Sequence, residues 1–141
     1  MDSDTFRSVL GRFATGVTIL TARDASGADH GMTVSAFCSL SLEPPLVLFC
    51  IDRTASMYGL LTGDPAPACG ISILSSDQEA YSRRFADETE QRFGGIPYSR
   101  GERGVVLLDD ALIDAVKTHY PVSWQALLHG KCFQGIHLLP C

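Results

Sequence analysis

Residues 31–53 read GMTVSAFCSLSLEPPLVLFCIDR and carry most of the information about the fold of this 141-residue chain. Small hydroxyl residues stand between two strand-like runs, and the stretch ends on Asp52 and Arg53. Hydroxyl groups both donate and accept hydrogen bonds, and small side chains let a planar ring approach the backbone. One interpretation is a bed for a flat polar ligand. The other is a polar loop followed by a buried strand.

The neighbouring segments predict further strands and a helix. Residues 46–51 are continuously apolar after Pro44-Pro45, which is typical of a strand buried on both faces. Residues 16–22 are rich in β-branched side chains, and a turn at residues 24–27 joins them to residues 31–37 as a hairpin. Nearer the start, Phe6, Val9, Leu10 and Phe13 recur at helical spacing, with Ser3 and Asp4 available as caps. We expect this helix to cover one end of a barrel.

The second half of the chain alternates short helices with short strands. The pattern predicts, in order, a helix at 55–61, a breaker at 63–67, a strand at 71–74, a helix capped by Asp77, a surface loop at 94–103, and strands at 105–108 and 111–118. The helix after Asp77 carries Tyr81, Arg84 and Phe85. No internal repeat or linker of domain size interrupts the chain, so residues 1–141 are expected to form a single domain.

Composition excludes several classes of protein. The net charge of -5 and the pI near 5.2 argue against a nucleic-acid partner, which needs clustered Lys and Arg. No apolar run approaches the roughly 20 residues that span a bilayer, and the acidic start lacks the features of a secretory signal. A cytoplasmic protein with no membrane partner is expected. Five cysteines without a CxxC pair indicate reduced thiols, with Cys38 and Cys50 as small buried residues, and no metal site.

Several strings along the chain together resemble the flavin reductase-like family, the reductase components of two-component flavin-dependent monooxygenases. They are Phe13–Thr21, Gly31–Phe37, Leu42–Leu46, Cys50–Arg53, Ile71–Gln78 and Arg84–Ala86, which stand in family order within residues 6 to 110. The resemblance implies a mainly β fold with peripheral helices, the split β-barrel that binds flavin, with a divergent C-terminal end. Short strands interrupted by helices are consistent with a closed or nearly closed antiparallel barrel, although periodicity alone does not give that topology.

The resemblance also assigns binding residues. It implies that Thr33, Val34, Ser35 and Ala36 line the isoalloxazine ring, and that Cys50, Ile51 and Asp52 close the facing side. It further implies that the ribityl phosphate is bound by Arg53, Thr54, Ala55 and Ser56. These residues stand at the start of the helix expected at 55–61, where free N–H groups favour an anion. Arg84 either reaches the phosphate or pairs with Asp87 or Glu88 on its own helix, and the pairing is favoured slightly. Ser72 stands where the family usually carries Asn.

The implied function is an NAD(P)H-dependent flavin reductase that supplies reduced FMN or FAD to a separate monooxygenase and forms a homodimer. Hydride transfer belongs to the cofactors, so no catalytic side chain is required. The family's Gly-Asp-His turn is absent from residues 122–131, where Trp124, Gln125 and His129 stand instead. Three explanations are open: a divergent reductase in which Trp124 stacks on a ring, a flavin binder without hydride exchange, or an altered C-terminus. The alternative function is therefore a non-catalytic flavin-binding or interaction protein on the same barrel.

Overall fold

Strands dominate the computed structural model, which describes residues 2–43, 45–87, 91–111, 113–116 and 136–140. In chain order the elements are α1 (Ser3–Leu10), β1 (Thr18–Arg23), β2 (Asp29–Val34), β3 (Phe37–Leu42), β4 (Pro45–Cys50), α2 (Tyr58–Leu61), β5 (Cys69–Ile73), α3 (Glu79–Ala86), β6 (Tyr98–Arg100), the 3-10 helix η1 (Glu102–Gly104), β7 (Val106–Leu108), β8 (Ile113–Val116) and β9 (Ile136–Pro140).

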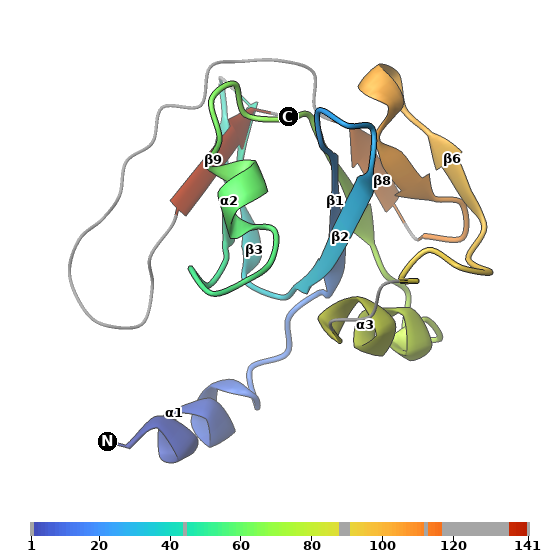
Figure 1. Cartoon of the computed structure of the whole chain (residues 1–141). Helices are drawn as coiled ribbons and strands as arrows, with labels where there is room; N and C mark the ends of the chain where they lie inside the picture. Colours follow the sequence, from blue (N-terminus) through green and yellow to red (C-terminus); the bar gives the residue numbers. More distant parts are fainter. Residues whose placement is uncertain (1, 44, 88–90, 112, 117–135, 141) are drawn as a thin grey trace.

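The strands form three antiparallel sheets. Their orders are β2-β1-β5-β8, β3-β4-β9 and β6-β7. Figure 1 shows the first two sheets facing each other, with α3 below β2 and the β6-β7 ribbon at the outer edge. The described strands make no continuous ring, so the closed barrel is not formed by them. The mainly β, split architecture expected from the sequence is confirmed.

Strands β1 and β5 are buried on both faces, and the prediction that residues 46–51 form such a strand was wrong. In β4, Val47 and Phe49 are buried, whereas the alternating Leu48 and Cys50 are half-buried. In β1, five consecutive residues are buried. One of them, Thr21, is polar, so the run does not read as continuously apolar in the sequence. Its burial is possible because its hydroxyl donates to the Val106 carbonyl at 2.6 Å.

Alternation along β1 divides the core in two. Leu20 and Ala22 contribute to a cluster between the two larger sheets, which also holds Phe49 of β4 and Leu61 of α2. Ile19 turns the other way and joins a second cluster beneath α3 and β7. The sheet formed by β1 and its neighbours therefore carries a packed layer on each side, and the candidate site described below stands at the end of this sheet where β2 finishes.

The β1–β2 hairpin follows the sequence prediction closely. Its register runs from Thr18 opposite Val34 to Arg23 opposite Asp29. The turn is held by Asp24, whose carboxylate accepts hydrogen bonds from the Ser26 hydroxyl and from the backbone N–H groups of Ser26 and Ala28. These bonds, led by that of the Ser26 hydroxyl and supported by His30, hold the pKa of Asp24 well below its ordinary value.

Four local predictions need correction. Helix α1 does not cover the barrel, because its apolar side chains are exposed, and Asp2 rather than Ser3 or Asp4 caps it. Helix α2 begins only at Tyr58. Asp77 does not cap α3, whose N-cap is Gln78. The loop expected at 94–103 contains β6 and the start of η1.

No described helix is both long and apolar enough to cross a membrane. Within the described ranges, no group of three or more His, Cys, Asp or Glu side chains is placed to hold a metal ion.

An ion pair joins β2 to the β6-β7 ribbon and makes a pH-dependent contribution to stability. Arg100 donates to both carboxylate oxygens of Asp29, at 2.7 and 3.0 Å. The Arg100 hydrogen bonds hold the pKa of Asp29 below its ordinary value. A lowered pKa contributes stability above the unfolded pKa of about 3.9, and that contribution is lost as the pH falls through the folded value.

We therefore expect the thermal midpoint of the native protein to fall as the pH is lowered below about 4. The Asp29→Asn variant should start with a lower midpoint at neutral pH and lose less of it in acid. Asp109→Asn serves as the control, since Asp109 is exposed and its side chain forms no ion pair with a described residue. Parallel acid profiles for the native protein and Asp29→Asn, measured by circular dichroism, would contradict this assignment.

Candidate functional site

The two segments that the sequence assigns to the ring-binding site lie side by side. The N–H of Cys50, at the end of β4, donates to the carbonyl of Ala36, in the link between β2 and β3, at 2.9 Å. In the same link the Phe37 N–H donates to the Ser35 carbonyl at 3.0 Å. Ser35 and Ala36 are both exposed. Together they form an open ledge of small side chains and backbone groups beside the end of β4.

A polar turn continues the ledge. Asp52 accepts hydrogen bonds from the N–H and the hydroxyl of Thr54, both at 2.8 Å, and its carbonyl accepts from the Ala55 N–H at 3.1 Å. The Thr54 bonds, the backbone one first, lower the pKa of Asp52, so its carboxylate is charged at neutral pH. On either side of the turn, Ile51 and Met57 are 5% and 1% exposed. Buried anchors at both ends therefore fix an exposed turn.

The helix start expected beneath the phosphate is not where the sequence placed it. Arg53, Thr54, Ala55 and Ser56 lie in the turn, and α2 begins two residues later at Tyr58. The helix is four residues long, so the dipole argument for anion binding does not apply to it. What remains at this position is the Arg53 side chain, which is exposed and forms no ion pair with any residue that the structure describes.

Thr33 and Val34 lie in the last part of β2, and both have polar groups that already form hydrogen bonds within the protein. The Thr33 hydroxyl donates to the Ser82 carbonyl of α3 at 2.6 Å. Val34 is 3% exposed, and its carbonyl accepts from the Thr18 hydroxyl at 2.7 Å. The proton of the Thr33 hydroxyl is thus used to hold α3, and the exposed polar groups near the ledge are those of Ser35 and of the turn after β4.

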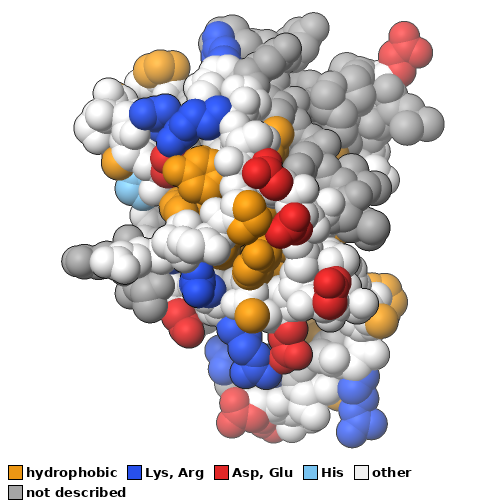
Figure 2. All heavy atoms as spheres, turned by 90° about the vertical axis from the view of Figure 1, so that its right-hand side faces the viewer, with side chains coloured by type: hydrophobic (Ala, Val, Ile, Leu, Met, Phe, Trp, Pro, Cys, Tyr) orange, Lys and Arg blue, Asp and Glu red, His pale blue; other side chains and the backbone are white. Residues whose placement is uncertain are grey.

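Of the two arrangements considered for Arg84 from the sequence, the structure bears only on the pairing within its own helix, and the contact with a phosphate stays a prediction. The Nη1 of Arg84 donates to the Gly94 carbonyl at 2.6 Å, and this arginine forms no ion pair with Asp87; Glu88 lies outside the described residues. Figure 2 shows the face that carries β6 and α3, where basic, acidic and apolar side chains are interspersed. Arg83 of α3 pairs with Glu79 at 2.6 Å. In the structure, Arg83 therefore contacts α3 itself, and Arg84 contacts the loop that follows the helix.

The sequence did not predict the contacts of Gly31 and Arg92, which support β2, or those of Gln78, which joins the start of α3 to the loop after β7. Gly31 lies against Phe85, so close that a Cβ atom there would stand 2.6 Å from the ring. Arg92 donates to the Gly31 carbonyl at 2.6 Å and to the Asp87 carbonyl at 3.0 Å. Gln78 accepts from the Ser75 N–H and donates to the Asp110 carbonyl. Only the glycine within a strand pattern was a usable signal, since the partners of the two polar side chains lie far along the chain or across a turn.

The cysteine and serine assignments need adjustment. Cys38 is exposed, contrary to the prediction that it is buried, and Cys50 is intermediate. Burial, followed by the nearby Cys38, raises the pKa of the Cys50 thiol. Ser72 is fully buried, and its hydroxyl accepts from the Leu108 N–H at 3.1 Å. Trp124, Gln125 and His129 lie outside the described residues.

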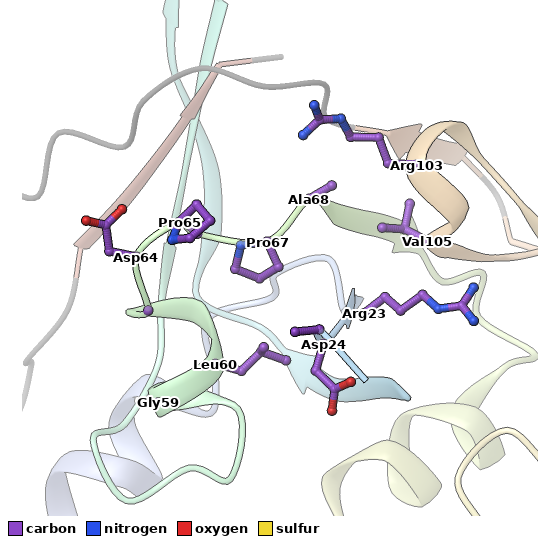
Figure 3. A pocket seen from close by; sticks show the side chains of 13 residues that line it. Arg23, Asp24, Gly59, Leu60, Asp64, Pro65, Pro67, Ala68, Arg103 and Val105 are labelled. Atoms are coloured by element: carbon purple, nitrogen blue, oxygen red, sulfur yellow. The ribbon is translucent and has the colours of Figure 1, made fainter. Parts of the chain in front are cut away.

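Two hollows formed by described residues lie away from the ledge. The larger, of about 620 Å³, lies between the β1–β2 turn, the segment from α2 to β5, and η1, and no predicted binding residue lines it. In Figure 3, Leu60, Pro67 and Val105 face its interior, whereas Asp64 and Arg23 point outward. A smaller hollow of about 310 Å³ is lined by Thr15, Ser75 and Ser82 among others. Ser82 connects this hollow to Thr33 through the hydrogen bond described above.

The ledge fits a flavin by its chemistry. Small side chains at Ser35 and Ala36 leave the backbone open to a planar ring, while hydroxyl and amide groups there donate and accept. The guanidinium of Arg53, which forms no ion pair with a described residue, is suited to a phosphate.

Comparison with known proteins decides the family. Residues 10–127 match the Flavin reductase like domain. This chain belongs to that family. It is 34% identical to the actinorhodin polyketide dimerase of Streptomyces coelicolor over 140 residues, which cover 97% of this chain and 77% of that protein. It is 44% identical to an NADH-dependent flavin reductase of Rhodococcus sp over 139 residues, which cover 91% of this chain and 73% of that one.

Solved structures agree with this membership. An NADH:FAD oxidoreductase of Streptomyces globisporus, solved in complex with NAD and FAD fragments, has a TM-score of 0.80 and 32% identity, covering 99% of this chain and 79% of that one. Other relatives are longer. The chain spans 34% of a probable flavin reductase of Rhizobium meliloti and 56% of the reductase subunit of a flavin-dependent monooxygenase of Rhodococcus jostii. Identity to the second is 35%, over 79% of this chain.

Proposed function

We propose that this chain is an NAD(P)H-dependent flavin reductase that supplies reduced FMN or FAD to a separate flavin-dependent monooxygenase. The observation that carries the proposal is the hydrogen bond between Cys50 and Ala36, which joins the small-residue link and the Arg53 turn into one ledge. Family membership supports the same reading, since matched relatives are named as flavin reductases and as a monooxygenase reductase subunit.

In this proposal the residues of the chain bind and orient. Thr33, Val34, Ser35 and Ala36 border one side of the ring, and Cys50, Ile51 and Asp52 border the other, with Ile51 and Val34 acting through the backbone because their side chains are buried. Arg53, Thr54 and Ser56 receive the phosphate, and Arg84 is a second candidate for it. When bound, a flavin and a nicotinamide together supply the hydride chemistry. The protein needs to supply only a stacked geometry.

The proposal also covers the domain organisation, the location and the oligomeric state of the protein. Residues 1–141 act as one domain in the cytoplasm, and two copies associate as a homodimer.

An anaerobic titration tests the reductase directly. The purified chain is mixed with FMN, or with FAD in a parallel sample, and NADH or NADPH is then added. The absorbance of the oxidised flavin is followed at its visible maximum, about 450 nm. We expect the absorbance to be lost within seconds to minutes. Tight flavin binding without this loss would contradict the proposal.

That outcome would favour the second candidate, a flavin-binding protein without hydride exchange. Two observations give it weight. The Gly-Asp-His turn is missing from residues 122–131, and the matched Streptomyces coelicolor protein carries a name that is not that of a reductase.

A further inference from the structure

A hollow of about 620 Å³ lies at the opposite end of β2 from the ledge. The β1–β2 turn, the segment from α2 to β5, and the segment from η1 to Val105 form its walls. Leu60, Pro67 and Val105 face its interior (Figure 3). Its volume is within the range of about 300 to 1,000 Å³ that is usual for small-ligand sites, which are mostly apolar with a few polar groups. The hollow therefore suits a ligand with an apolar body.

The walls of the hollow are held by the rest of the fold. Val105 is 1% exposed, and Leu60 packs against the core cluster between the two larger sheets. On the side of the turn, the Nε of Arg23 donates to the Gly27 carbonyl at 2.9 Å and stands 4.0 Å from the Asp29 carboxylate. A ligand therefore enters a shape that the fold already provides, which lowers the entropic cost of binding.

Arg103, which lines this hollow, has a backbone conformation that an arginine adopts only at a cost. Its φ of 60° and ψ of 15° are left-handed, and in the described part of the chain it is the only residue other than glycine with a positive φ. Glycine adopts this conformation without the steric penalty of a Cβ atom, as Gly104 does at a φ of 75°. Strain of this kind clusters at functional sites. The exposed Arg103 side chain is therefore the first candidate for a polar contact with a ligand.

The acidic side chains at the rim are directed to other partners. Asp24 accepts from the Ser26 hydroxyl through Oδ1 at 2.6 Å, and its Oδ2 lies 2.9 Å from the Nε2 of His30. Asp64 points outward (Figure 3). An anionic group in the hollow therefore meets the guanidinium of Arg103 with little opposition from these carboxylates. A guanidinium binds a carboxylate through two parallel hydrogen bonds, and the single charge of a carboxylate matches one arginine better than the nearly double charge of a phosphate does.

We propose that this hollow is a second binding site of the chain, for a small organic acid with an apolar body. Leu60, Pro67 and Val105 contact the body, and Arg103 binds the carboxylate. The site is separate from the ledge, since no residue assigned to the flavin lines it. The proposal does not rest on the reductase function.

Isothermal titration calorimetry on the full chain tests the site with two matched probes. Cinnamate carries a carboxylate on an apolar body, and cinnamamide has the same body without the charge. We expect cinnamate to bind at least about tenfold more tightly, the ratio that a hydrogen bond to a charged group supplies. Arg103→Gly removes the side chain and relieves the strained backbone. It should weaken cinnamate binding at least about tenfold and change cinnamamide binding less than about threefold.

Two further variants make this result specific. Arg103→Asn also removes the charge, and Asn tolerates the left-handed conformation, so it should show the same loss as Arg103→Gly without adding a flexible glycine. Arg83→Ala is the control, because Arg83 pairs with Glu79 at 2.6 Å on α3 and does not line the hollow. Both affinities should stay unchanged in this variant.

The proposal fails if the native chain binds neither probe at millimolar concentration, or binds both equally. Unchanged cinnamate affinity in both Arg103 variants would overturn it as well. Saturation with FMN supplies the last comparison. Cinnamate should bind the FMN-loaded chain with the same dissociation constant, whereas displacement by FMN would place cinnamate on the ledge and overturn the second site. Failure of FMN itself to bind counts against the proposed reductase and not against the hollow.

Discussion

Gly31→Ala should lower the free energy of unfolding by about 3 kcal/mol, the upper end of the range for overpacking a core. A Cβ atom at this position would lie 2.6 and 2.9 Å from two carbons of the Phe85 ring and 3.0 Å from Phe93. Phe85 is 1% exposed and stacks edge-on against Phe93 with ring centroids 5.1 Å apart. Because the Phe85 ring is packed in the core, with the half-buried Phe93 against it, Phe85 cannot retreat without opening a cavity elsewhere.

Chemical denaturation in urea measures this effect, and two further variants sharpen it. Gly16→Ala is the matched control, since nothing lies within 4 Å of a Cβ built there, and its unfolding free energy should change by less than about 1 kcal/mol. Phe85→Leu removes part of the obstructing ring. The double variant Gly31→Ala with Phe85→Leu should therefore lose at least about 1 kcal/mol less than the sum of the single losses. Strict additivity would contradict the contact.

Arg53→Ala should weaken FMN binding about 100-fold while leaving riboflavin binding nearly unchanged. The expected size corresponds to about 3 kcal/mol, the upper value for a hydrogen-bonded charged group. The reason is that FMN carries the phosphate and riboflavin does not, while Arg53 is the exposed cation of the turn that continues the ledge. Quenching of flavin fluorescence on titration with each variant gives both dissociation constants.

Two arginines of α3 provide the comparison. Arg83→Ala removes a charge that is already paired with Glu79 and should leave both affinities unchanged. Arg84→Ala tests the second phosphate candidate, and because its Nη1 is used by the Gly94 carbonyl, we expect less than a threefold effect, or under about 0.7 kcal/mol. An equal loss of FMN and riboflavin affinity in Arg53→Ala would remove Arg53 from the phosphate site. A larger effect at Arg84 than at Arg53 would transfer the role.

The local sequence predicted those parts of the molecule whose partners are near in the chain. The β1–β2 hairpin is one example, because β-branched strands and the turn around Asp24 are encoded within about a dozen residues. Strand β4 was predicted from its apolar run, with boundaries shifted by one residue, and α3 was predicted from a cap at Asp77, whereas its N-cap is Gln78. The family strings also located the segments 33–36 and 50–56, and the Cys50–Ala36 hydrogen bond brings these segments together.

By itself, then, the sequence determined the strand order of the hairpin, the mainly β class and the two segments of the candidate site. Only the tertiary structure decided that the Thr33 hydroxyl donates to the Ser82 carbonyl, that Arg92 donates to the Gly31 carbonyl, and that the apolar side chains of α1 are exposed. The two hydrogen bonds join residues 49 and 61 positions apart. No local pattern encodes them, because they depend on which faces meet when the sheets and helices pack and on which polar groups that packing leaves to be satisfied.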